Sequence, residues 1–214
     1  MKSTLFELNN NQLSCKKLDR AQVAKYEYQI LLEIPILNAY SIEYATVTVN
    51  NSTTGVTIDD IEDNTIKIDS EYQIDDDSQI YVEIYYQGIR DYGALFPWIS
   101  NMKFRERLGQ FYEEMTKTFE NQIWLAFSLS VAAVIEGMLH AKLDFPTENN
   151  TLEKLLKRAK TTDIITIKEF EILSKARQNR NLVHSNKYES DYVTKKDCLD
   201  MRVTIDRLVK KFCE

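Results

Sequence analysis

The chain has 214 residues, of which 43% are hydrophobic and 28% are charged. This composition is ordinary for a globular protein, and the length suffices for one large domain or two small ones, each with its own core. Five glycines and three prolines argue against long disordered linkers and against a glycine-rich phosphate loop.

The net charge of −6 is unevenly distributed along the chain. Residues 1–100 hold 7 Lys and Arg against 16 Asp and Glu, a balance of −9, whereas residues 101–214 hold 20 against 17, a balance of +3. Only the second part could therefore bind a polyanion without a strong repulsive field. This surplus permits nucleic-acid binding without requiring it.

No segment of the sequence has the pattern of an export signal or a membrane span. The first residues lack the apolar segment of a secretory signal, and the longest apolar stretch, residues 126–139, is interrupted by Glu136 and is too short to cross a bilayer. Cys15, Cys198 and Cys213 share no metal-ligand spacing, so we expect reduced thiols. We expect a cytoplasmic protein that neither enters a membrane nor carries a metal or other cofactor.

The first part of the chain has the composition of β-strands. Four runs are rich in β-branched and aromatic residues with partial alternation, namely 26–34 (YEYQILLEI), 41–49 (SIEYATVTV), 65–68 and 80–87 (IYVEIYYQ). A turn cluster, residues 50–55 (NNSTTG), follows the second run. We therefore predict a small antiparallel β domain, rich in acidic residues, over residues 1–94.

Tyrosines and aspartates of this part offer two candidate binding features. Nine of the twelve tyrosines fall here; they could form an aromatic binding surface, but cross-strand pairs in a small sheet explain them at least as well, and we prefer that interpretation. The loop with Asp75, Asp76 and Asp77 lacks the glycine and the spaced glutamate of a calcium loop. We expect it to be a solvated acidic loop.

At residues 88–97 the spacing of apolar residues changes. Before this segment they tend to alternate with polar residues, as in strands, and after it they recur every three or four residues, as in helices. The segment GALFPWIS is interpreted as the hinge, with Phe96 and Trp98 packed at the junction. Five helices are predicted, over residues 102–119, 121–142, 151–160, 166–184 and 194–212. They form a second, α-helical domain over residues 95–214, so the predicted fold class is α+β, a small antiparallel β domain followed by a helical bundle.

Local signals support these helices. The second is nearly apolar all round, so it should be the central, buried helix of the bundle. Thr151 is the expected N-cap of the third. The fourth and fifth begin with capping-box patterns, Thr166-x-x-Glu169 and Thr194-x-x-Asp197.

The end of the fourth predicted helix, residues 176–186 (ARQNRNLVHSN), is the most informative stretch. At about 100° per residue, Arg177, Arg180, Asn181 and His184 share one stripe of the helix, whose earlier part is apolar. Two guanidiniums and an imidazole on one face are suited to bind an anion. Alternatively, these residues only complement the helix macrodipole and cap its last carbonyls, and residue types alone favour that alternative.

The run Arg-Asn-Leu-Val-His at residues 180–184, preceded by Arg177, resembles the signature of the HEPN superfamily, in which an Arg-x(4–6)-His motif ends the penultimate core helix. The layout of the second domain is also similar: a helix with an internal Glu136, a short helix, the motif helix and a final helix. Arg177 is separated from His184 by six residues and fits the long form of the motif. Arg180 forms the usual Arg-Asn pair but is separated from His184 by only three residues, so either arginine could carry the family's role.

The resemblance implies a metal-independent endoribonuclease that acts as a homodimer, with two motifs in one cleft. His184 would assist proton transfer as the ribose 2′-OH attacks the adjacent phosphorus, and Arg177 and Arg180 would hold the phosphate. Asn181 would orient the substrate or His184. Because the nucleophile belongs to the substrate, the implied substrate is RNA. A toxin or anti-phage defence role would follow from family habit alone.

Other interpretations stay open. HEPN-like bundles also act as non-catalytic dimerisation or binding modules, and the β domain would then recognise a protein or ligand partner. The β domain could also be a sensor, or a brake whose negative field keeps RNA away. His140, on the central apolar helix, is interpreted as a core histidine rather than a metal ligand. The sequence shows no catalytic-triad, Walker or dinucleotide fingerprint.

Overall fold

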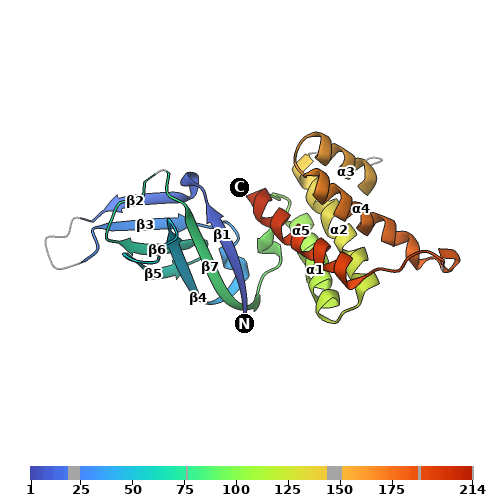
Figure 1. Cartoon of the computed structure of the whole chain (residues 1–214), viewed down its shortest axis with the longest axis horizontal. Coiled ribbons are helices and arrows are strands. Elements are labelled where there is room, and N and C mark those ends of the chain that lie inside the picture. The colour runs from blue at the N-terminus through green and yellow to red at the C-terminus, as the bar shows by residue number, and fades with distance from the viewer. Residues whose placement is uncertain (19–24, 76, 144–150, 188, 214) are drawn as a thin grey trace. The chain divides into compact units, whose positions relative to one another are not determined.

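The computed structural model describes residues 1–18, 25–75, 77–143, 151–187 and 189–213 of the chain. The chain divides into two compact units, Met1–Ala94 and Leu95–Glu214, and the division falls within the segment where the sequence changes from strand-like to helical periodicity. The seven strands of the described residues lie in the first unit and the five α-helices in the second (Figure 1). The predicted α+β class is confirmed.

The strands of the first unit form two antiparallel sheets. In chain order they are β1 (Lys2–Leu8), β2 (Leu13–Lys17), β3 (Tyr28–Glu33), β4 (Tyr40–Val49), β5 (Val56–Glu62), β6 (Thr65–Ser70) and β7 (Ile80–Ile89). One sheet has the order β1-β7-β4 and the other the order β2-β3-β6-β5. Neighbouring strands are antiparallel throughout both sheets.

The four predicted strand runs correspond to β3, β4, β6 and β7, whereas the sequence pattern does not single out β1, β2 and β5. β2 has no buried residue, so it lacks the apolar alternation that identifies a strand. In β5 a register shift between Ile58 and Asp60 interrupts the alternation, so the half-buried residues Val56, Ile58 and Ile61 do not keep a period of 2. The misses of β2 and β5 thus have local structural causes.

Alternate positions of three strands fill the core of the β unit. The hydrophobic side chains that are 0% exposed at these positions are Ile30, Leu32, Ile66, Ile68, Ile80, Val82 and Ile84. Burying one such side chain stabilises a fold by about 1.5–3 kcal/mol. Both sheets thus contribute to the stability of this unit.

The predicted turn at residues 50–55 is confirmed. Asn50, Asn51 and Gly55 have positive φ angles of 50°, 63° and 80°, a conformation that Asn tolerates and Gly adopts freely. A Cβ atom added to Gly55 would lie 2.8 Å from the ring of Tyr72. Both the backbone conformation and the available space therefore require glycine there.

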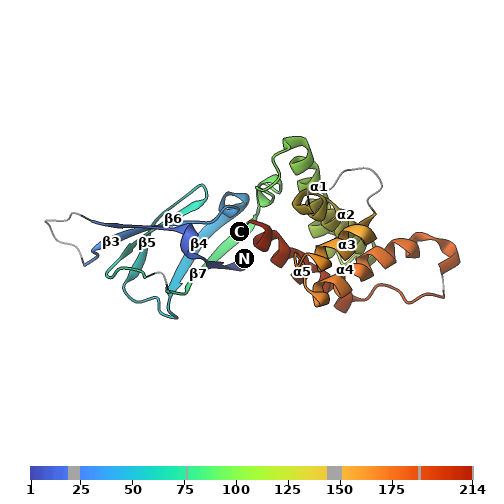
Figure 2. The ribbon, with the colours of Figure 1, turned by 90° about the horizontal axis from the view of Figure 1, so that it is seen from above.

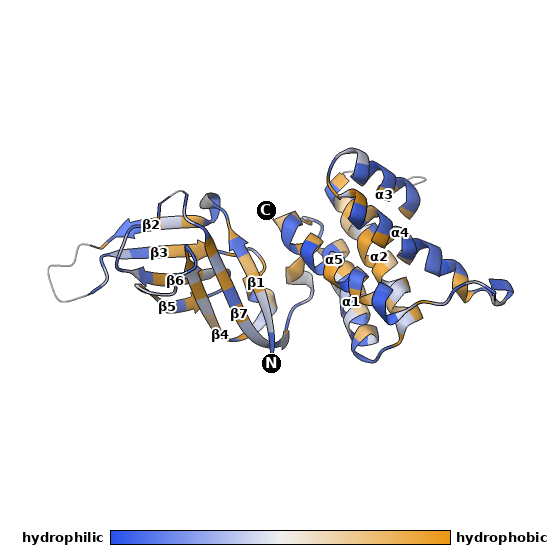
Figure 3. Ribbon diagram, in the orientation of Figure 1, coloured by the Kyte–Doolittle hydropathy of each residue, from blue (hydrophilic) through white to orange (hydrophobic). Residues whose placement is uncertain are grey.

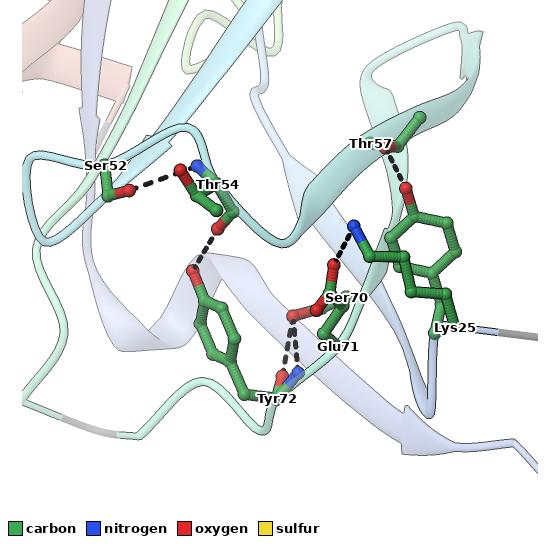
Figure 4. A network of polar contacts seen from close by, with 8 residues as sticks. Lys25, Ser52, Thr54, Thr57, Ser70, Glu71 and Tyr72 are labelled. Carbon is green, nitrogen blue, oxygen red and sulfur yellow. Dashed lines mark hydrogen bonds and ion pairs between the residues drawn. The ribbon is translucent and has the colours of Figure 1, made fainter.

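Tyr72 fastens this turn to the end of β6 (Figure 4). Its hydroxyl donates to the carbonyl oxygen of Thr54 at 3.2 Å, and the buried Ser70 Oγ donates to the carbonyl oxygen of Tyr72 at 2.6 Å. In the same cluster Lys25 forms an ion pair with Glu71. These contacts hold the start of β5 beside the end of β6.

Tyrosines pair across neighbouring strands, as predicted. Tyr44 of β4 and Tyr85 of β7 are register partners, and their rings stack with centroids 4.3 Å apart. Tyr40 and Tyr86, on the same two strands, meet edge to face at 4.8 Å. The cross-strand interpretation is confirmed for these four residues.

Two smaller expectations concern the acidic loop and the cysteines. Asp75 and Asp77 are exposed, and Asp76 lies outside the described residues. The three cysteines are free, without a disulfide in the described part of the chain. Burial raises the pKa of the Cys198 thiol to about 11, so this thiol is protonated at neutral pH.

The second unit is a helical bundle. Its helices are α1 (Met102–Glu120), α2 (Trp124–Leu143), α3 (Leu152–Thr161), α4 (Ile167–Asn179) and α5 (Lys195–Cys213). α2 contacts each of the other four helices of the bundle, which Figure 2 shows from a second side. Hydrophobic residues are concentrated along α2 (Figure 3). The predicted five helices and the central position of α2 are confirmed.

One face of α2 is only half-buried. Leu129, Ala133, Glu136 and His140 recur there at helical spacing, so the helix expected to be buried is buried on only part of its surface. By length and composition alone α2 could also cross a membrane. The apolar stretch considered in the sequence, residues 126–139, is by itself too short for this, but the helix is longer than that stretch. A core helix of a globular protein passes the same test, and the contacts of α2 with four helices fit that role.

Side-chain caps confirm the predicted helix starts. Thr151 Oγ1 accepts a backbone N–H of the first turn of α3 at 3.4 Å. Thr166 and Glu169 form a reciprocal capping box, with bonds of 3.2 and 2.8 Å. Thr194 Oγ1 accepts the N–H of Asp197 at 3.1 Å. These bonds satisfy donors that the first turn of a helix leaves free.

The hinge aromatics pack within the helical unit. Phe96 is fully buried, and its ring centroid lies 5.5 Å from that of Trp98 and 5.9 Å from that of Tyr112 in α1. Trp98 in turn lies 5.7 Å from Phe212 in α5. Edge-to-face contacts of this kind pack the segment that precedes α1 against α1 and α5.

Candidate functional site

The helix that carries the motif ends earlier than expected. α4 ends at Asn179, Arg180–Val183 forms a 3-10 turn, and His184 has an extended backbone with φ −87° and ψ 125°. The prediction that this helix continues to His184 is therefore wrong. Asn179 and Asn181 have low helix propensity, and a 3-10 turn commonly closes an α-helix.

The four predicted site residues nevertheless line one pocket of about 620 Å³. We call it the motif pocket, and its lining residues are Leu129, Thr151, Leu152, Glu153, Arg177, Arg180, Asn181, Val183 and His184. They come from α2, from the start of α3, and from the end of α4 with the turn that follows it. The structure thus brings the four predicted residues together, although the α-helix ends before His184.

A hydrogen bond between helices fixes the end of α4. Asn179 Nδ2 donates to Ser128 Oγ at 2.8 Å, and Ser128 is fully buried in α2. Sequence reasoning missed this contact. Its signal was a serine in the interior of an apolar helix, because a buried hydroxyl needs a partner.

Each arginine of the motif pairs with a carboxylate from another helix. Arg177 Nη1 lies 3.3 Å from Glu153 Oε2, and Arg180 Nη1 lies 3.4 Å from Glu136 Oε2. A guanidinium has five N–H donors, so one such contact leaves donors for a ligand. The ion pairs therefore orient both guanidiniums and offset part of their charge.

Glu153 is ionised at neutral pH. Its hydrogen bond with Lys157 at 2.7 Å, the charge of Lys157 and then the charge of Arg177 hold the pKa of this carboxyl below its ordinary value. The motif pocket thus contains a fixed negative charge beside its cations. An anionic ligand must compete with this carboxylate for Arg177.

His184 lies at the exposed end of the pocket. Its backbone N–H donates to the carbonyl oxygen of Asn181 at 3.1 Å, and its carbonyl oxygen accepts the N–H of Lys187 at 2.9 Å. These bonds hold the backbone, while none of the described residues forms a hydrogen bond with the imidazole. The ring nitrogens can therefore form hydrogen bonds with a ligand.

The two carboxylates are the main additions to the predicted site. Glu136 interrupts the apolar sequence of α2, and such a charge in a core helix was a signal for a polar partner. Glu153 had no such signal, because glutamate is common in the first turn of a helix. Its contact with Arg177, across 24 residues of sequence, depends on how α3 packs against α4.

A second pocket adjoins the motif pocket between α1 and α2. This α1–α2 pocket of about 480 Å³ has Phe104, Phe111, Glu136 and His140 among its lining residues, and it shares Leu129 and Arg180 with the motif pocket. The prediction of a core position for His140 is therefore wrong, since its half-buried ring stands at a pocket wall. Among the described residues, no group of three or more His, Cys, Asp or Glu is placed to hold a metal ion.

A third pocket, of about 420 Å³, lies where the end of α4 meets the segment before α5. It shares Asn181 with the motif pocket. Two of its charged groups are paired, because Lys175 Nζ lies 2.6 Å from Asp197 Oδ1. We call it the α4–α5 pocket.

Two guanidiniums, an amide and an imidazole thus face one pocket. Guanidiniums bind phosphate oxygens through paired N–H donors, an amide both donates and accepts, and an imidazole transfers protons near neutral pH. This set can hold a phosphodiester and move a proton at its edge. No protein-family model matches the chain, and no curated protein or solved structure matches it.

Proposed function

We propose that the protein is a metal-independent endoribonuclease of HEPN type that acts in the cytoplasm. One observation carries this proposal: Arg177, Arg180, Asn181 and His184 line a single pocket. The charge distribution supports it, because the helical part of the chain carries +3 and the β-rich part −9. The net charge of the helical part would therefore attract RNA, whereas that of the β-rich part would repel it.

In the proposed reaction the ribose 2′-oxygen attacks the adjacent phosphorus and the bond to the 5′-oxygen breaks. The products are a 2′,3′-cyclic phosphate and a 5′-hydroxyl. Arg177 and Arg180 hold the nonbridging oxygens and stabilise the charge added in the transition state. His184 transfers one of the two protons, and Asn181 orients the phosphate or the imidazole.

The second proton transfer requires another group. The motif pocket contains one imidazole, so we assign the other to a second copy of the chain, paired across a two-fold axis that joins two motif pockets. A homodimer is then the active form. Cleavage of cellular RNA by such a dimer would arrest growth, in keeping with a toxin or anti-phage defence role.

The central test is cleavage of single-stranded RNA by the purified full chain in the presence of EDTA. His184→Ala is expected to lower the cleavage rate by about two to four orders of magnitude, with an unchanged circular-dichroism spectrum and melting temperature. The RNA fragments should end in 2′,3′-cyclic phosphates. A 2′-deoxy substitution at the cut position should abolish the cut, because the nucleophile is then missing.

Arg207 provides a matched control for the arginines. It pairs with Glu169 at 3.5 Å on the described part of α5 and does not line the motif pocket. Arg177→Gln and Arg180→Gln should each slow cleavage, whereas Arg207→Gln should not. Cleavage that survives His184→Ala, or equal losses in all three arginine variants, would contradict the proposal.

A second candidate is a non-catalytic binding module. The observation that favours it is that carboxylates at 3.3 and 3.4 Å already pair with both arginines, so their role could be structural. The β unit would then contact a protein or ligand partner. Lack of RNA cleavage by the wild type, together with a lower melting temperature of Arg177→Gln, would favour this function.

A further inference from the structure

The α1–α2 pocket is a mostly apolar hollow beside the motif pocket. The small residues Ala133 and Gly137 of α2 are among its lining residues. At Gly137 an added Cβ would lie 2.7 Å from Leu108 Cδ1, so α1 already approaches the backbone of α2 closely there. The volume of about 480 Å³ falls in the range of pockets that bind small organic groups.

Aromatic rings form the walls of this pocket. Phe104 and Phe111 are seven residues apart on α1 and thus share one face of that helix. His140 of α2 meets the Phe104 ring edge to face at 6.3 Å. Phe111 is 38% exposed, although burial of a phenylalanine ring is favourable. Flat aromatic surfaces are suited to stack with another ring system.

Two residues join this pocket to the motif pocket. Leu129 and Arg180 line both, and Arg180 reaches toward α2 through its contact with Glu136. A phosphate held by Arg180 would therefore have the aromatic pocket next to it. In a polynucleotide, the group that lies beside each phosphate is a ribose with its base.

We propose that the α1–α2 pocket holds one unpaired nucleobase of the RNA, next to the phosphate bound in the motif pocket. This inference rests on the proposed ribonuclease function. It makes single-stranded RNA the substrate class, because a base can enter such a pocket only when it is neither paired nor stacked in a helix. The Glu136 carboxylate and the His140 ring are the polar groups available to the edge of that base.

Binding of an uncleavable oligonucleotide to the full chain tests this proposal. The probe is a short 2′-O-methyl RNA with one 2-aminopurine, whose fluorescence falls when the base stacks. Wild type should bind the probe and quench it. Phe111→Leu keeps an apolar side chain but removes the aromatic face, so it should lower affinity about tenfold and remove the quench.

Two controls make the measurement specific, one an altered oligonucleotide and the other a protein variant. An oligonucleotide with an abasic site in place of the 2-aminopurine should bind wild type and Phe111→Leu equally, because the base that contacts the ring is absent. Val203 of α5 is an apolar residue, 61% exposed, that lines neither pocket. Val203→Ala should therefore bind and quench as wild type does.

A variant that fills the pocket provides an independent check. Ala133→Leu adds bulk at the half-buried floor while both phenylalanines remain. It should weaken binding of the intact probe and leave binding of the abasic probe unchanged. Equal affinities of wild type, Phe111→Leu and Ala133→Leu for the intact probe would overturn the proposal, as would the absence of binding or of quenching by wild type.

A second copy of the chain is the competing occupant of this pocket. If Phe111→Leu halves the mass of the protein in sedimentation, the pocket is a subunit interface and the nucleobase proposal is wrong. Parallel cleavage assays separate the two proposals. Quenching without cleavage would contradict the ribonuclease function alone, and cleavage without quenching would contradict the base pocket alone.

Discussion

Arg177 and Arg180 are each held by a carboxylate of another helix but have different surroundings. Arg177 contacts Glu153 at the start of α3 and lines the motif pocket. Arg180 contacts Glu136 of α2 and lines both the motif pocket and the α1–α2 pocket. In the proposed reaction Arg177 would bind the phosphate, and Arg180 would bind the same phosphate from the side of the neighbouring base.

Glu153 is expected to weaken RNA binding. Glu153→Gln keeps the shape of the side chain but removes the negative charge beside Arg177. The variant should bind a 2′-O-methyl RNA about twofold to fivefold more tightly, because the phosphate no longer competes with an ion pair of the strength usual at protein surfaces. Fluorescence anisotropy at about 0.1 M salt measures the change.

Glu113 of α1 is the matched control for this prediction. It forms an i,i+4 ion pair with Lys117, as Glu153 does with Lys157, but it lines neither the motif pocket nor the α1–α2 pocket. Glu113→Gln changes the net charge by the same amount and should leave RNA affinity unchanged. Equal affinities of the two variants would show that Glu153 does not compete with the phosphate.

At the scale of elements, the start of α5 is tied to α4 by a short polar cluster. Lys175 of α4 donates to Asp197 Oδ1 at 2.6 Å, and Thr194 Oγ1 donates to Asp197 Oδ2 at 2.5 Å. The bond from Lys175, followed by that from Thr194, lowers the pKa of the Asp197 carboxyl below its ordinary value. The charged carboxylate is therefore favoured in the folded state.

This pKa shift predicts a pH-dependent contribution to stability. A lowered folded-state pKa stabilises the fold above the unfolded-state pKa of about 4 and loses its effect as pH falls through the folded-state pKa. Asp197→Asn should thus cost about 0.5–1 kcal/mol at pH 7. The difference from wild type should shrink below about pH 4, as measured by urea unfolding across pH.

Asp200, exposed on the same helix, is the control for that titration. Asp200→Asn removes an equal charge. Within the described residues the Asp200 side chain has no hydrogen bond that this substitution would break. A pH-independent deficit in Asp197→Asn would show that the ionised carboxylate does not carry the effect. The same pH profile in Asp200→Asn would assign the effect to general charge rather than to the cluster.

At the scale of the whole molecule, the two units have separate cores and opposite net charges. Residues 1–94 carry the same 7 basic and 16 acidic groups as residues 1–100, because residues 95–100 are uncharged. The β unit therefore has a balance of −9 and the helical unit one of +3. Under the proposed function, the helical unit would bind RNA and the β unit would repel it.

The proposed composite site predicts that activity depends on protein concentration. If two chains share the proton transfers, cleavage per chain should fall on dilution through the dimer dissociation constant, because a lone chain lacks the second group. Analytical ultracentrifugation over the same concentrations should give the same midpoint. Constant activity per chain in a monomeric sample would rule out the composite site.

The parts of the fold that sequence predicts well depend on short separations along the chain. The capping box of Thr166 and Glu169 spans three residues, and so does the Thr194–Asp197 cap. Strand and helix periodicities are local as well. The exceptions are also local: a bulge hides β5, and a 3-10 turn replaces the last helical turn before His184.

The contacts that shape the candidate site span longer separations. Arg177 and Glu153 are 24 residues apart, Arg180 and Glu136 are 44 apart, and Asn179 and Ser128 are 51 apart. No pattern in the sequence pairs these residues. Their meeting depends on the packing of α2, α3 and α4, which no single segment encodes.

By itself, the sequence determined the α+β class, the five helices with their caps, and the four residues of the motif, because all of these follow from neighbours within a few positions. Only the tertiary structure decided that both arginines are paired with carboxylates and that an aromatic pocket adjoins the motif pocket. The physical reason is that side chains meet across helices when buried faces pack together. Because that packing depends on residues from several helices together, no single stretch of sequence predicts it.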